Sequence, residues 1–88
     1  MRYEVNLDGI NCKEQFHKRV EETIPCPEHY GKNLDALYDV LTEYGEQTQI
    51  VWKHFQDFLQ TMPGYAEAVK ALCEDAQAEN PMLCIILE

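Results

Sequence analysis

The chain has 88 residues, 16 of them acidic and seven basic, so its formal net charge is -9 at pH 7. A chain of this length builds one modest core, and we expect a single domain over residues 1–88. The charge repels nucleic acid and anionic membranes, whose binding depends on lysine and arginine contacts to phosphate. A basic protein is the partner that it attracts, although acidity can also serve solubility alone.

Neither a targeting segment nor a membrane span is visible in the sequence. The first residues alternate polar and apolar side chains and lack the apolar run of a signal peptide. No stretch approaches the roughly 20 apolar residues that cross a bilayer. The four cysteines include no Cys-x-x-Cys pair, so we expect free thiols and a cytoplasmic protein. These cysteines are Cys12, Cys26, Cys73 and Cys84.

The chain should begin with a strand, because apolar and polar side chains alternate over residues 3–7 before the turn pair Asp8-Gly9. A helix should follow, with Asn11 as its N-cap and Glu14 as the partner in a capping box. Its apolar stripe has four-residue spacing. The segment Pro25-Cys26-Pro27 should end this helix, because proline donates no backbone hydrogen bond.

A second helix is expected over residues 33–46, with Asn33 as its N-cap and Gly45 as a plausible stop. The remaining chain should form a strand, a short helix broken by Pro63-Gly64, a longer helix and a final strand. These elements are expected near residues 48–52, 54–62, 65–80 and 82–87.

Strands separated by helices indicate an α/β fold in which right-handed crossovers join parallel strands. The second and third expected strands lack polar alternation, as strands do when helices cover a parallel sheet. We therefore expect a three-stranded parallel sheet packed with about four helices.

The second helix carries its charge on one side. At 100° per residue, its leucines gather on one face, and an acidic row of Asp35, Asp39 and Glu43 stacks on the other, extended by Glu46. Like charges at four-residue spacing destabilise an isolated helix, and no lysine interrupts the row. Carboxylates one turn apart are separated by roughly 6 Å, so the row can imitate a nucleic-acid backbone. It is therefore a candidate surface for binding a cationic protein.

Part of this pattern also has a structural explanation. Asp35 lies in the first turn, where the helix dipole favours an acid. Tyr38 lies at the edge of the apolar face, either as a half-buried core residue or as an aromatic contact for a partner. Asp39 is harder to explain by stability, because it lies mid-helix with an acid one turn away on each side.

The sequence gives little sign of an enzyme. Its three histidines lie in different segments, it contains no serine, and no cysteine has a nucleophile motif. Cys26 and His29 have the spacing of metal ligands, but no second pair completes a site, so we expect no metal and no cofactor. A catalytic pair of acids stays an alternative. A second alternative is an acidic adaptor or nucleic-acid mimic that binds a different basic protein.

The segment from Pro27 to Thr42 resembles the signature of the barstar family, which consists of intracellular inhibitors of barnase-type ribonucleases. Its specific core is Tyr-Gly-Lys-Asn-Leu-Asp-Ala-Leu-Tyr-Asp over residues 30–39, and the resemblance extends to the terminal Ile85-Ile86-Leu87. The resemblance implies a barstar-like fold and an immunity-type inhibitor. We expect the protein to be monomeric when free. The implied partner is a basic, extracellular-type ribonuclease or a related toxin domain.

The resemblance also implies roles for individual residues. Asp39 matches the acid that enters the active site of the enzyme and pairs with its phosphate-binding arginine and histidine residues. Asp35 matches an acid that contacts the backbone and basic rim of the enzyme, and Asp75 matches a peripheral acid. The remaining candidates for partner contact, from the motif or from the acidic row, are Tyr30, Gly31, Asn33, Tyr38, Thr42, Tyr44 and Glu46.

Three positions depart from the best-known pattern of the family. His29 replaces a tyrosine that stacks on the enzyme, so this contact becomes smaller and pH-dependent. Lys32 puts a positive charge where an acid is expected, and Glu43 replaces a glycine that lies against the enzyme. These changes keep the acidic row and alter its rim.

Overall fold

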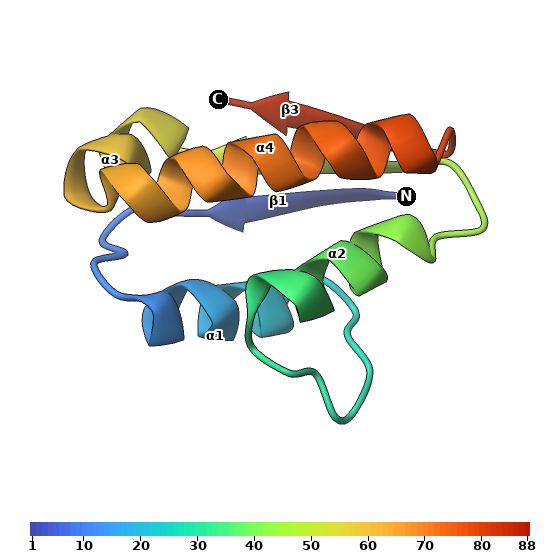
Figure 1. Cartoon of the computed structure of the whole chain (residues 1–88), viewed down its shortest axis with the longest axis horizontal. Coiled ribbons are helices and arrows are strands. Elements are labelled where there is room, and N and C mark those ends of the chain that lie inside the picture. Colours follow the sequence, from blue (N-terminus) through green and yellow to red (C-terminus); the bar gives the residue numbers. More distant parts are fainter.

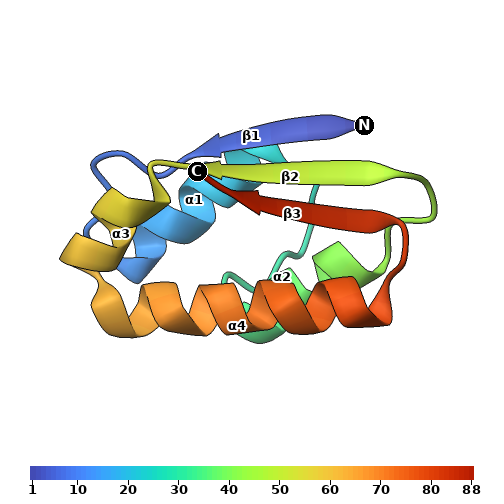
Figure 2. The ribbon, with the colours of Figure 1, turned by 90° about the horizontal axis from the view of Figure 1, so that it is seen from above.

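Three parallel strands form one sheet, and all the helices lie on the same face of it (Figures 1 and 2). The computed structural model describes every residue from 1 to 88. In chain order, the elements are β1 (Arg2–Asn6), α1 (Lys13–Thr23), α2 (Leu34–Thr42), β2 (Thr48–Lys53), α3 (Phe55–Thr61), α4 (Pro63–Glu79) and β3 (Leu83–Leu87). The predicted α/β class, with a three-stranded parallel sheet and four helices, is confirmed.

The strand β2 lies in the middle of the sheet, between β1 and β3. Its register places Ile50 beside Tyr3 of β1 and Ile85 of β3. The helix-facing side of the sheet forms the floor of the core, where Trp52 is fully buried and stacks on Phe16 of α1 with 5.7 Å between ring centroids. Apolar side chains from α1 and α4 complete this core, and Figure 2 shows both helices on the same side of the sheet.

The helix α2 is the element farthest from the sheet, seated over the space between α1 and α4 (Figures 1 and 2). It is held there by Leu37 and Leu41, which are fully buried, and by Val40 beside them. Burying a leucine side chain stabilises the fold by about 1.5–3 kcal/mol. The leucine face thus fixes α2 to the helical layer and leaves its opposite face in solvent.

Two helix starts differ from the predictions. The N-cap of α1 is Cys12, which is extended and makes no side-chain cap, and the Asn11 N–H instead donates to Gln15 Oε1 at 2.8 Å. The capping box of Asn11 and Glu14 is therefore wrong, because the helix begins one residue later. The short helix α3 ends before Pro63 as predicted, but α4 begins at Pro63 and not near Tyr65, because Pro63 occupies its first turn. Its missing N–H has no intrahelical partner at that position in any case.

The predicted end of α2 is also wrong. The helix stops at Thr42 with Glu43 as its C-cap, so Glu46 follows the helix and does not extend the acidic row. The residues after Thr42 bond elsewhere: the Asn80 side chain donates to the Tyr44 carbonyl at 3.1 Å, and the Thr48 hydroxyl donates to the Glu46 carbonyl at 2.9 Å. Gly45 is therefore not the residue that ends α2, because the helix has already ended at Thr42.

Candidate partner-binding surface

The loop before α2 is shaped by short-range contacts. The Tyr30 N–H donates to the Pro27 carbonyl at 3.0 Å, which turns the chain. Asn33 then caps α2 as predicted, because its Oδ1 accepts the Ala36 N–H at 2.8 Å. A Cβ on Gly31 would lie 3.3 Å from the Ala36 Cβ, so a side chain at this position would press against the first turn of the helix. The glycine lets the loop lie close to α2.

The acidic row of α2 (Asp35, Asp39 and Glu43) is exposed along its whole length. None of the four ion pairs in the structure involves a residue of this row, and α2 contains no basic residue. The Lys32 ammonium lies 3.7 Å from the Glu21 carboxylate of α1 instead. The acidic row is therefore not neutralised within the protein.

A groove of about 270 Å³ runs between the loop and α2. We call it the Asp39 groove, and its lining residues are Pro27, His29, Tyr30, Gly31, Ala36, Asp39, Val40 and Glu43. The fold thus brings Asp39 and Glu43 together with His29, which is ten or more residues away from both in the chain. Asp35 lies outside the groove on the same helix. The combination of apolar walls and two carboxylates suits a side chain that is cationic at its tip.

Two of the predicted contact residues, Tyr30 and Tyr44, have their hydroxyl groups inside the protein and not at its surface. Tyr30 is only 7% exposed, and its hydroxyl lies 2.8 Å from His17 Nδ1. The other ring nitrogen of His17 lies 2.6 Å from the hydroxyl of Tyr65. Burial raises the pKa of Tyr30 and lowers the pKa of His17. The hydroxyl of Tyr44 is buried without a hydrogen-bond partner, and burial raises its pKa as well.

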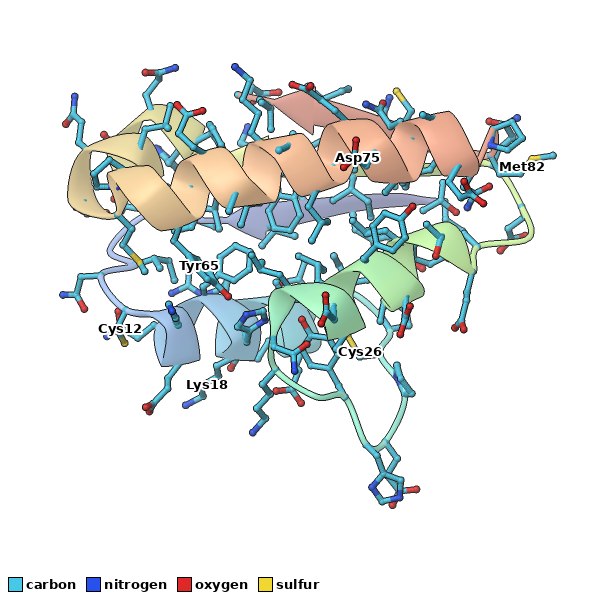
Figure 3. All side chains as sticks on the ribbon, viewed as in Figure 1. Cys12, Lys18, Cys26, Tyr65, Asp75 and Met82 are labelled. Atoms are coloured by element: carbon cyan, nitrogen blue, oxygen red, sulfur yellow. The ribbon has the colours of Figure 1, made fainter.

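The other predicted residues lie around α2. Tyr38 is half-buried against the core, and the Thr42 hydroxyl donates to the Tyr38 carbonyl at 2.9 Å. Asp75 is exposed and projects from α4, the helix that packs beside α2 (Figure 3). Glu46 is exposed in the loop that leads to β2. The candidates therefore come from the loop, from α2 and its following loop, and from α4.

Sequence reasoning missed two residues that support this surface. His17 anchors Tyr30 and so fixes the loop, and its place beside Phe16 in the apolar stripe of α1 is a signal of burial. Asn80 bonds to carbonyls at the end of α2, and no local pattern indicates this contact. No group of three acidic, cysteine or histidine side chains is arranged to hold a metal ion.

The parallel sheet, the helices on one of its faces and the exposed acidic row of α2 define a small α/β protein with an anionic face. Residues 1–87 match the barstar family, described as the barnase inhibitor. The chain belongs to the barstar family of ribonuclease inhibitors, whose members are not enzymes. A relative named Putative ribonuclease inhibitor YrdF, from Bacillus subtilis (strain 168), is 33% identical over 76 residues, which cover 83% of this chain and 84% of the relative. None of the helices has the length and apolar character that a membrane span requires.

Proposed function

We propose that this protein inhibits a barnase-type ribonuclease by laying the acidic row of α2 over the cationic active site of the enzyme. In this arrangement Asp39 occupies the place of the scissile phosphate, where it cannot be cleaved. One observation carries the proposal: Asp39 lies in a groove with a second carboxylate, and no cation of the protein pairs with either. A surface with unpaired acids favours a partner that supplies the missing cations.

The chemistry of a ribonuclease active site fits this surface. Arginine binds carboxylates and phosphates through the same pair of parallel N–H donors, so a carboxylate can satisfy a phosphate-binding arginine. The net charge of -9 supports rapid association with a basic enzyme, because attraction at long range steers the two proteins together. Charge therefore governs the encounter, and the Asp39 groove governs the fit.

The neighbouring residues are assigned supporting parts in this proposal. Asp35 and Asp75 contact the basic rim of the enzyme, each from a different helix, and His29 forms an outer wall of the Asp39 groove. Tyr30 and Tyr44 mainly support the surface from inside the protein and contact the enzyme little, because most of their own surface is already buried. The remaining proposed contacts are Gly31, Asn33, Tyr38, Thr42, Glu43 and Glu46.

We further propose that residues 1–88 act as one domain, monomeric when free, in the cytoplasm. The four cysteines are free thiols, which fits a reducing compartment. Cys73 is buried, and burial raises its pKa to about 12, so this thiol should resist oxidation.

The direct test is titration of barnase activity on RNA with the purified protein. Inhibition should reach completion at one inhibitor per enzyme and should weaken as salt is raised, because the two surfaces are oppositely charged. Binding without loss of RNA cleavage would instead indicate an acidic adaptor that uses a different site. A serum albumin control of similar acidity excludes nonspecific binding by charge.

A further inference from the structure

The side chain of Asn80 connects three elements of the fold. It is 6% exposed, and its Nδ2 donates to the carbonyls of Leu41 and Tyr44, both at 3.1 Å. Its Oδ1 accepts the Met82 N–H at 3.1 Å. Asn80 is also the C-cap of α4 and directly precedes the turn into β3. One buried amide thus joins the end of α2 to the end of α4 and the start of β3.

The end of α2 needs such a donor from outside the helix. The last carbonyls of a helix have no intrahelical partner. The Asp39 carbonyl accepts from the Thr42 hydroxyl at 3.3 Å, and the Val40 carbonyl accepts from the Glu43 N–H at 3.4 Å, both weak contacts. The Leu41 carbonyl accepts a hydrogen bond from the Asn80 side chain. The last turn contains no basic residue, and Glu43 opposes the helix dipole there.

We propose that Asn80 is a positioning residue of the inhibitory surface. By holding the Leu41 and Tyr44 carbonyls, it keeps the last turn of α2 wound and keeps Asp39 and Glu43 at the groove in the orientation that the enzyme requires. Three of the eight residues that line the Asp39 groove lie in or directly after this turn, so its unwinding would open one wall. The inference rests on the proposed function, because it concerns how well the same surface fits the enzyme.

The test compares Asn80→Ala with Gln77→Ala. Gln77 is a matched control, because its Oε1 accepts the Ile85 N–H at 2.7 Å, and this hydrogen bond joins α4 to β3 and not to α2. Neither change alters the net charge, so electrostatic steering stays the same. Association and dissociation rate constants with barnase are measured on material whose folded fraction is known from circular dichroism. Amide hydrogen exchange of the free variants reports on residues 41–45.

Asn80→Ala should raise the dissociation rate constant roughly tenfold, which corresponds to about 1.4 kcal/mol, and leave the association rate constant within about twofold. Exchange over residues 41–45 should be faster. Gln77→Ala should leave dissociation unchanged even where it lowers stability. An unchanged dissociation rate in Asn80→Ala, or an equal increase in both variants, would overturn the inference.

A second pair of variants covers the case in which Asn80→Ala does not fold. Asn80→Leu roughly keeps the volume of the side chain and adds no charge but loses both donor contacts, and Gln77→Leu makes the same kind of change at the control position. The same difference in dissociation rate is expected between them, and equal rates would refute the positioning role. Absence of inhibition by the wild-type protein would overturn the proposed function and this inference together, whereas normal dissociation of the Asn80 variants from an inhibited enzyme would overturn the inference alone.

Discussion

Replacement of Asp39 by asparagine separates the role of its carboxylate in binding from any role in folding. The side chain is exposed and forms no ion pair, and it has an acid one turn away on each side, Asp35 and Glu43. Removing its charge relieves two repulsive contacts of about 0.2–0.5 kcal/mol each. Aspartate and asparagine have similar helix propensities. The free energy of unfolding should therefore change by less than about 1 kcal/mol.

The effect on binding should be much larger. An arginine of the enzyme that is buried against Asp39 would lose its counter-charge and stay desolvated, which costs more than about 2 kcal/mol. This corresponds to a dissociation constant increased by roughly 30-fold or more. Inhibition of barnase by Asp39→Asn is compared with inhibition by Glu22→Gln, which removes an exposed acid from α1 and should have little effect. Denaturant unfolding of the same samples gives the stability. If Asp39→Asn unfolds the protein while affinity per folded molecule is preserved, the assignment of Asp39 is wrong.

Three further predictions follow from buried and exposed groups of the same region. Leu37→Ala should lower the free energy of unfolding by about 2–5 kcal/mol, because it leaves a cavity beneath α2; denaturant unfolding checks this, and a smaller loss would mean that the helix repacks. Glu43→Lys should slow association with barnase more than it speeds dissociation, and an unchanged association rate would remove Glu43 from the interface. His17 should make the protein less stable in mild acid. Burial lowers its pKa below 6.5, so the unfolded chain takes up its proton first, and stability should fall as the pH decreases below about 6.5. Unfolding at pH 7.5 and pH 5.5 should show a smaller loss in His17→Gln than in the wild type, and equal losses would contradict this account.

The order of elements and the exposed acidic row could be predicted because both depend on local periodicity. Leu37 and Asp39 face opposite ways for the simple reason that two residues turn an α-helix by about 200°. The end of α2 could not be predicted in this way. It depends on Asn80, which lies 39 residues beyond Leu41 in the chain and reaches it only in the folded state.

The aromatic residues show a second limit of sequence reasoning. Tyr30 lies in the family motif, in the loop before α2, but its hydroxyl lies 2.8 Å from His17 Nδ1 in the core. A pattern along the chain tells which residues are aromatic and not which way each ring points. The Asp39 groove could not be predicted from the sequence either, because its walls come from the loop and from α2 and meet only in the folded protein. The loop contains Lys32, whose backbone is in the left-handed region.

The position of α2 as the outermost helix separates mutations that alter recognition from mutations that alter folding. The side chains at His29 and Glu43 are exposed, and exchanges at such positions usually change stability by less than about 0.5 kcal/mol. Such exchanges leave the packing of the sheet and of the leucine face of α2 unchanged. Under the proposed function, such an inhibitor can therefore adapt to changes in the enzymes that it recognises, one exposed residue at a time, without passing through unstable intermediates.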